Sequence, residues 1–157
     1  MLKVADGVRY GDTTPLRFPF WVSGIPAGWQ ASAAAFIESP TAPLAQSLSI
    51  GPATDPTAAS ISVTAANRGP GCQFIPRQSR YVTVDGVKGI MQANAYYQQL
   101  CVSNVNGEIL QVGLKLRNSG TGSAVPGVTA VGGVLGIVKH LHLLGPDQGG
   151  WTTSPLR

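Results

Sequence analysis

Hydrophobic and polar residues alternate along the middle of the chain, which predicts β-strands. Residues 61–65 (ISVTA) alternate with a period of two, as expected for a strand with one buried face. Residues 81–91 contain the clearest hairpin pattern, because Asp85 and Gly86 favour a type I′ turn in which glycine takes a positive φ without steric cost. We therefore expect antiparallel strand pairing in this region.

A second hairpin is predicted further along the chain. Residues 95–103 alternate again, and Asn106 with Gly107 provides another tight turn that leads into residues 109–116. Strands joined by tight turns form an antiparallel meander of hairpins. Shorter hydrophobic and β-branched patterns predict further strands before it, at residues 18–23, 30–38 and 48–50.

The C-terminal region carries the pattern of one amphipathic helix. Ser123 is a suitable N-cap, and Pro126 fits the first helical turn. Gly145, followed by proline, predicts the end of the helix. The residues of its expected apolar stripe are Val128, Val131, Leu135, Val138 and His142. Glycines in this segment would weaken an isolated helix, so we expect it to form by packing closely against the sheet.

The chain has 157 residues, a length that suits one domain. Only 11% of the residues are charged, against roughly a quarter in an average protein, and there are 20 glycines and 12 prolines. This composition excludes a long charged helix or a coiled coil. We expect a single α+β domain over residues 1–157, an antiparallel β-sheet covered by a C-terminal α-helix. A loose N-terminal arm at residues 1–14 and a C-terminal tail at residues 146–157 complete the predicted organisation.

The chain has two cysteines, Cys72 and Cys101. Without a nearby Cys/His cluster they do not provide the four ligands of a structural zinc site. A disulfide between them would close a loop of about thirty residues and stabilise the fold by about 3–4 kcal/mol in the chain-entropy model. Two buried, reduced side chains are the alternative. The disulfide interpretation implies an extracytoplasmic location, secreted or membrane-anchored, with the export signal or anchor outside the given sequence.

The positive charge of the chain is modest, with a net charge of +4 and a pI near 9.4. Its densest basic stretch contains Arg68, Arg77, Arg80 and Lys88, offset by Asp85. Nucleic-acid binding proteins concentrate charge on one face beside aromatic side chains, so this thin excess does not favour specific nucleic-acid binding. It is compatible with weak attraction to an anionic envelope polymer, or with an ordinary solvated surface.

No group of residues predicts catalysis, a cofactor or a metal site. In the glycine-rich loop at residues 118–129, residues 122–129 approach the spacing of a phosphate-binding loop, but Val128 occupies the lysine position and Pro126 removes one backbone amide. On a helix, His140 and His142 would point about 200° apart and could not hold one metal ion together. The carboxylates lie mostly in turn sequences, which explains them without a catalytic pair.

Tryptophans add to the candidate binding surface. Large aromatic side chains mark ligand grooves and interfaces, although they also pack in cores and at their rims. The residues of the candidate binding surface are Trp21, Trp29, Trp151, Arg68, Arg77 and Arg80. Their positions in the chain do not reveal a shared partner.

Two stretches of the sequence resemble known proteins. Residues 18–29, with Phe-Pro-Phe and Gly-Ile-Pro-Ala-Gly-Trp, resemble the opening of PsbP/Mog1-like domains. Residues 140–156 are similar to the ends of uncharacterised actinobacterial exported or membrane-anchored ectodomains. Those proteins often carry a Val-Asp-Gly hairpin and a Leu-Cys strand, as residues 84–86 and 100–101 do here. The resemblance implies a sandwich of an antiparallel sheet and helices, and no catalytic residues, because members of that superfamily mostly act as binding or assembly modules.

These observations lead to one main hypothesis and two alternatives. The main hypothesis is a non-catalytic extracytoplasmic binding domain of a secreted or membrane-anchored bacterial protein, whose partner is a protein or an anionic envelope polymer. The first alternative is a cell-envelope hydrolase with a histidine or carboxylate assembled across loops. The second alternative is a small-ligand carrier with an aromatic groove near the tryptophans.

Overall fold

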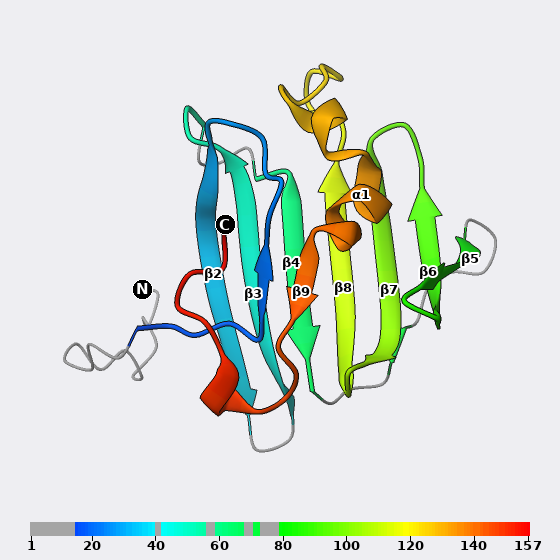
Figure 1. The fold of residues 1–157 in the computed structure, drawn as a ribbon. Helices are drawn as coiled ribbons and strands as arrows, with labels where there is room; N and C mark the ends of the chain where they lie inside the picture. Colours follow the sequence, from blue (N-terminus) through cyan, green and yellow to red (C-terminus); the bar gives the residue numbers. More distant parts are fainter. Residues whose placement is uncertain (1–14, 40–41, 56–58, 68–70, 73–78) are drawn as a thin grey trace, which may run out of the picture.

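The computed structural model describes residues 15–39, 42–55, 59–67, 71–72 and 79–157. Within these residues the main element is a seven-stranded antiparallel sheet with the strand order β2-β3-β4-β8-β7-β6-β5 (Figure 1). The strands are β2 (Trp29–Ser39), β3 (Ala42–Pro52), β4 (Ile61–Ala66), β5 (Ser79–Val84), β6 (Val87–Ala93), β7 (Tyr97–Val105) and β8 (Glu108–Lys115). The predicted N-terminal arm, residues 1–14, lies outside the described residues.

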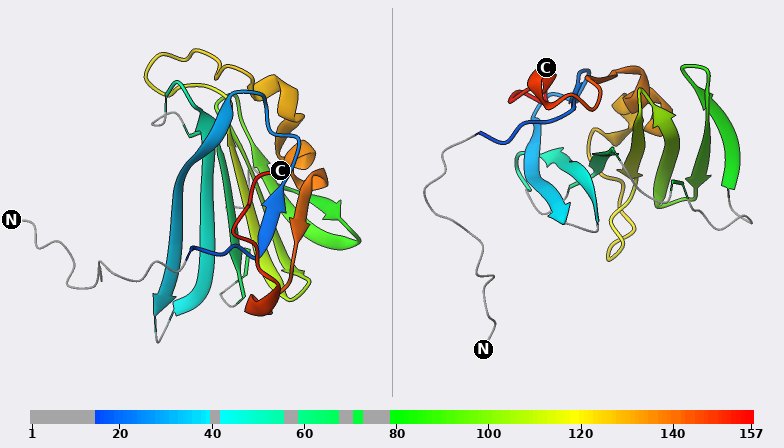
Figure 2. Two further views of the ribbon diagram at one scale, coloured as in Figure 1. Left: turned by 60° about the vertical axis from the view of Figure 1, so that its left-hand side comes forward. Right: turned by 90° about the horizontal axis from the view of Figure 1, so that it is seen from below.

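A second layer lies on one face of this sheet. β1 (Phe20–Val22) pairs antiparallel with β9 (Leu141–Leu143), and α1 (Gly133–Lys139) contacts β7 and β8. Figure 2 shows β1, β9 and α1 on the same side of the seven strands. We call this side the covered face of the sheet and the opposite side the open face.

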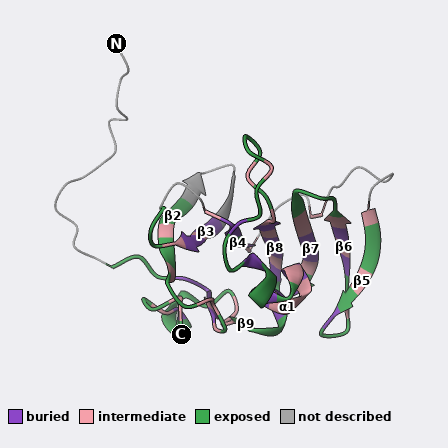
Figure 3. Ribbon diagram, turned by 90° about the horizontal axis from the view of Figure 1, so that it is seen from above, coloured by how far each residue is buried: buried purple, intermediate pink, exposed green. Residues whose placement is uncertain are grey.

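The hydrophobic core lies between the two layers. Every second residue of β4 is buried, and each of these residues pairs with a buried residue of β8. The pairs are Ile61 with Leu114, Val63 with Val112 and Ala65 with Leu110. Figure 3 shows buried stretches on the central strands beside α1. The alternation predicted for residues 61–65 is confirmed, because apolar side chains occupy only the covered face there.

Both predicted hairpin turns are present. Asp85 and Gly86 have φ angles of 47° and 80°. Asn106 and Gly107 have φ angles of 52° and 83°. Positive φ at both central residues is the mark of a type I′ turn, whose twist matches that of the flanking strands. These turns join β5 to β6 and β7 to β8, which confirms the antiparallel meander.

The N-terminal strands were predicted with less detail. β2 confirms the strand expected at residues 30–38, whereas β3 is much longer than the strand expected at residues 48–50. The strand expected at residues 18–23 is present as β1, but it pairs with β9 and not with the seven-stranded sheet. That pairing joins segments far apart in the sequence, so no local pattern could indicate it.

The predicted C-terminal helix is wrong in its extent. A short 3-10 turn, η2 (Val128–Val131), precedes α1, and α1 has only seven residues. The two segments begin after Gly127 and Gly132 rather than after Ser123, and His142, expected on the helical stripe, lies in β9. No helix in the described part of the chain is long and apolar enough to cross a membrane.

Left-handed glycines explain the interruption of the helix. Gly127, Gly132 and Gly133 have φ angles of 79°, 69° and 75°, in the left-handed region, so a right-handed helix cannot run through them and α1 only begins at Gly133. Two glycines also permit close contacts. A Cβ atom on Gly133 would lie 2.7 Å from Oε1 of Gln98 in β7, and one on Gly136 would collide with the carbonyl oxygen of Val131.

The predicted C-terminal tail is packed against the covering layer. It contains a short 3-10 turn, η3 (Gln148–Gly150), followed by Trp151, which is only 8% exposed. Beyond it, Thr152 forms a bridge with Phe18 and Leu156 with Val22. The tail therefore runs beside β1 and completes the layer on the covered face.

Candidate functional site

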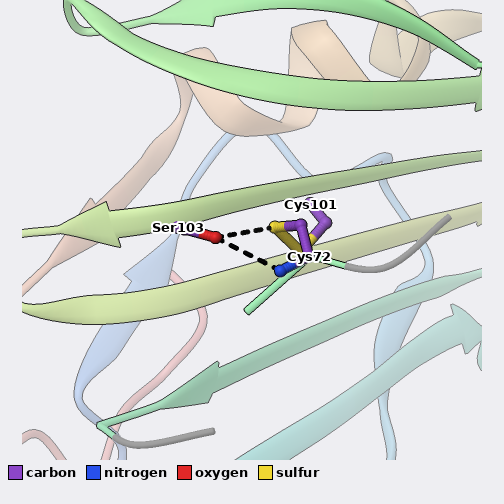
Figure 4. The surroundings of a disulfide bond; sticks show 3 residues. All are labelled: Cys72, Cys101 and Ser103. Carbon is purple, nitrogen blue, oxygen red and sulfur yellow. Dashed lines mark hydrogen bonds between the residues drawn. A yellow bond between two sulfur atoms is a disulfide. The ribbon is translucent and has the colours of Figure 1, made fainter. Parts of the chain in front are cut away.

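The predicted disulfide between Cys72 and Cys101 is present. Cys101 lies in β7 and is fully buried. Cys101 pairs with Gln111 in β8. Side chains of paired residues lie on the same face of the sheet, and the side chains of Cys101 and Gln111 point away from α1. The disulfide therefore lies on the open face. Ser103 supports it: its hydroxyl accepts a 3.2 Å hydrogen bond from the Cys72 amide and donates one of 3.2 Å to Cys72 Sγ (Figure 4). Both thiols are used, so neither serves as a nucleophile.

A groove lies on the open face where four strands run side by side. The strand register pairs Ser49 with Ser62, Ser62 with Gly113, and Gly113 with Gln99, which forms one row across β3, β4, β8 and β7. Tyr97 pairs with Lys115 next to this row. The groove has a volume of about 360 Å³, and its lining includes Ser49, Ser62, Tyr97, Gln99, Gly113 and Lys115. We call it the open-face groove.

Gly113 permits a close contact in the lining of the open-face groove. A Cβ atom at this position would lie 2.5 Å from the hydroxyl oxygen of Ser62, so the Ser62 side chain occupies the space that a larger residue would need. Tyr97 is 41% exposed, and Lys115, its cross-strand partner, is half-buried. The lining of the groove therefore offers hydroxyl, amide, aromatic and ammonium groups.

A second pocket lies at the edge of the molecule, beside β2. It has a volume of about 500 Å³ and is lined by Pro15, Leu16, Arg17, Phe36, Gln148, Gly149 and Trp151. Leu16 and Phe36 are 40% and 42% exposed, so this pocket presents two large apolar side chains to solvent. The indole nitrogen of Trp151 donates a 2.9 Å hydrogen bond to the Gly145 carbonyl, so this ring forms a fixed wall. We call this space the edge pocket.

The three predicted tryptophans have different neighbours. Trp21 stacks on His142 with ring centroids 3.7 Å apart, and the Arg157 guanidinium lies 4.7 Å from the centre of its ring. Trp29 packs against the core, near the backbone of Gly127. Trp151 alone lines the edge pocket. The structure thus does not bring the tryptophans together in one aromatic groove.

Of the three arginines predicted for the binding surface, the structure describes only Arg80, since Arg68 and Arg77 lie outside the described residues. Arg80 is exposed on β5 and its guanidinium lies 3.6 Å from the sulfur of Met91. It lines a groove of about 360 Å³ with Gly132 and Leu135, on the side of the sheet that carries α1.

The histidines and the glycine loop do not form a catalytic site among the described residues. His142 is exposed and stacked on Trp21, and His140 is exposed beside Gly24. In the loop after β8, the Gly122 amide donates to the Asn118 carbonyl, and Arg117 donates to the Gly122 carbonyl. The described residues contain no group of three or more His, Cys, Asp and Glu side chains that could hold a metal ion.

One buried carboxyl group is not among the site residues predicted from the sequence. Glu108, the first residue of β8, is only 1% exposed, and its Oε2 atom has no hydrogen-bond partner. Burial raises the pKa of Glu108 from 4.5 to about 7. The alternation of β8 could have indicated this burial. Glu108 lies two and four residues before Leu110 and Val112, so its side chain points to the same face of the strand, toward the core.

Comparison with protein families, curated proteins and solved structures finds no match to this chain. The resemblance to PsbP/Mog1-like domains therefore stays a prediction. A functional conclusion has to come from the site geometry described above.

Proposed function

We propose that this chain is a non-catalytic binding domain of a secreted or membrane-anchored bacterial protein and that it acts outside the cytosol. The disulfide between Cys72 and Cys101 is compatible with that location, because such bonds persist in oxidising compartments. The observation that carries the binding role is the open-face groove, a space of about 360 Å³ on the uncovered side of the sheet. Its volume falls within the range of small-molecule sites.

The placement of titratable groups supports a role without catalysis. Among the residues that the structure describes, the lining of the open-face groove contains no carboxylate and no histidine. Glycoside hydrolysis generally needs two carboxyl groups on either side of the scissile bond, and the buried Glu108 faces the core instead. Binding is therefore the simpler role for this surface, and the cell-envelope hydrolase is the weaker hypothesis.

An envelope polymer is the partner that we favour over a protein. Protein interfaces are usually built around large aromatic and arginine anchors in a well-packed centre. The centre of the open-face groove instead contains the serine and glutamine side chains of Ser49, Ser62 and Gln99, which suit a hydroxyl-rich partner. Lys115, which also lines the groove, would attract an anionic polymer.

We also propose a PsbP/Mog1-like sandwich and an actinobacterial source for this chain. The support is the resemblance of residues 18–29 and 140–156, together with an antiparallel sheet that has helix α1 on one face. An experimental structure of one of the resembling ectodomains would test this relationship. A different strand order in that structure would contradict it.

Co-sedimentation with cell-wall fragments tests the proposed function. Purified, oxidised protein is mixed with insoluble wall fragments of an actinobacterium, and the bound fraction is measured after centrifugation. We expect saturable binding and no release of soluble sugars or peptides from the fragments. Absence of binding would remove the envelope role, and release of fragments would favour the hydrolase.

The edge pocket supports a second candidate function, the small-ligand carrier. Its exposed Leu16 and Phe36 and the fixed ring of Trp151 would suit an apolar ligand. Titration with lauric acid, read out by tryptophan fluorescence, tests this role. A saturable change that is lost in Trp151→Phe would support a carrier, and a flat response would count against it.

A further inference from the structure

The polar groups of the open-face groove can both donate and accept hydrogen bonds. Ser49 and Ser62 provide hydroxyls, and Gln99 provides an amide. Sugar hydroxyls also donate and accept hydrogen bonds. An apolar chain can do neither, and a carboxylate ion accepts hydrogen bonds but does not donate them. The match of chemistry therefore points to a polyol.

The dimensions of the groove suit a short chain of sugars. Ser49, Ser62, Gly113 and Gln99 lie in one register row across four neighbouring strands. Three inter-strand spacings give this row a length of about 14 Å. At Gly113 the row carries no side chain of its own, and the Ser62 hydroxyl lies over this position, where it can reach a bound sugar.

Tyr97 and Lys115 add an aromatic ring and a positive charge to the groove. The exposed ring of Tyr97 provides an apolar surface on which the C–H face of a sugar can stack. Lys115, its cross-strand partner, is the one charged residue in the described lining. Because no carboxylate of that lining neutralises it, its ammonium group suits an anionic substituent of the bound sugar.

We infer that the open-face groove binds an oligosaccharide that carries an anionic substituent, a carboxylate or a phosphate. The sugar rings lie along the row from Ser49 to Gln99, one ring stacks on Tyr97, and the anion contacts Lys115. This inference rests on the proposed function, which it narrows from an envelope polymer to an acidic glycan.

An NMR titration of the oxidised protein tests the inference with defined probes. The probes are trigalacturonic acid, phosphorylated maltotriose, neutral maltotriose and inorganic phosphate. We expect saturable amide shifts at Ser62, Gln99 and Gly113 with at least one charged sugar, and binding to neutral maltotriose at least tenfold weaker. The charged sugar that binds identifies the substituent. Equal binding of charged and neutral sugars, shifts at other residues, or no shifts with any sugar would overturn the inference.

Matched variants separate the groove from the rest of the open face. Lys115→Gln should weaken binding of the charged sugar about tenfold and leave neutral maltotriose unchanged, since the lost contact is a charge-assisted one. Tyr97→Ala should weaken binding of both sugars. The controls are Lys88→Gln and Tyr81→Ala, because these residues form a lysine–tyrosine contact of 3.8 Å on β5 and β6, outside the groove. Equal effects of the control and groove variants would contradict the assignment.

The cell-wall assay distinguishes failure of the inference from failure of the proposed function. If the wild-type protein binds wall fragments and the Lys115→Gln and Tyr97→Ala variants bind equally well, the acidic-glycan site is wrong while the binding role remains. If the wild-type protein binds neither wall fragments nor any sugar probe, both proposals fail. Thermal unfolding of each variant confirms that a loss of binding does not reflect a loss of folding.

Discussion

At the scale of single residues, the most consequential side chain is a buried carboxyl group beside a hairpin turn. Glu108 follows the Asn106-Gly107 turn directly, but its side chain is buried against the core. A buried carboxylate without full hydrogen bonding is costly, and the raised pKa expresses that cost. Folding stability should therefore depend on pH through this residue.

The pH dependence has a defined sign. The pKa of Glu108 is raised in the folded state, so its contribution to stability is fully present below pH 4.5 and is lost as the pH rises through about 7. We expect Glu108→Gln to remove this loss and to increase the free energy of unfolding at pH 8 by about 3 kcal/mol relative to the wild type. Urea denaturation at pH 4, 6 and 8 measures the effect.

Asp85→Asn is the matched control for the pH experiment. Asp85 is an exposed turn residue, and asparagine tolerates its positive φ of 47°. This variant should retain the pH dependence of the wild type. A wild-type stability that does not change between pH 4 and 8 would contradict the role of Glu108.

The disulfide also acts at the residue scale. Cys72 and Cys101 are 29 residues apart, and removing the bond frees that loop in the unfolded chain. We expect the double variant Cys72→Ala/Cys101→Ala to be less stable by about 3–4 kcal/mol. Urea denaturation provides the measurement, with reduced wild-type protein as the comparison. If the oxidised wild type and the double variant unfold at the same urea concentration, the loop is already restricted without the bond.

At the scale of elements, the turns and strands of the meander could be predicted, whereas the C-terminal helix could not. Asp-Gly and Asn-Gly turns depend on two adjacent residues and the strand period depends on a few neighbours, so both are visible locally. The segment from residue 123 to 145 has helical spacing of apolar residues as well, but Gly127, Gly132 and Gly133 within it take left-handed φ. Residues 141–143 then form strand β9, which pairs with β1. This pairing competes with the continuation of the helix, and the local spacing of apolar residues does not reveal it.

Gly133 provides a test of this explanation. Helix propensity alone predicts that Gly133→Ala stabilises α1. Its φ of 75° and the nearby Gln98 side chain, which accepts a 3.0 Å hydrogen bond from the Val134 amide, predict the opposite. We expect a loss of about 1–2 kcal/mol in the free energy of unfolding.

Gly120→Ala is the control for this substitution. A Cβ atom at Gly120 meets no neighbour within 4 Å, so this variant should unfold like the wild type. Denaturation curves of the two variants and the wild type, recorded under one condition, provide the comparison. A stabilised Gly133→Ala protein would show that the left-handed glycine is not required.

At the scale of the whole molecule, the fold has one apolar face covered by α1 and the β1–β9 pair and one open polar face. Tryptophan, arginine and histidine stand out in this sequence because they are few. The open-face groove is built mainly from serine, glutamine and glycine in four separate strands, and only the register brings them together. The fold class was therefore accessible from the sequence, but this candidate site was not.

The location of the protein can be tested on the whole chain. Protein isolated from its native host, treated with an alkylating reagent without reduction, should carry no label on Cys72 or Cys101, because both sulfurs are bonded. Intact-mass spectrometry measures the label, and a reduced sample provides the positive control. Labelling of both cysteines in the unreduced sample would remove the argument for an oxidising compartment.

The pairing of β1 with β9 has a consequence for the biogenesis of the protein. β1 (Phe20–Val22) can pair only after β9 (Leu141–Leu143) has been synthesised. The bridge between Phe18 and Thr152 requires a still later part of the chain. The covering layer can therefore close only after residues 141–152 have been synthesised, and until then part of the apolar face of the sheet stays uncovered.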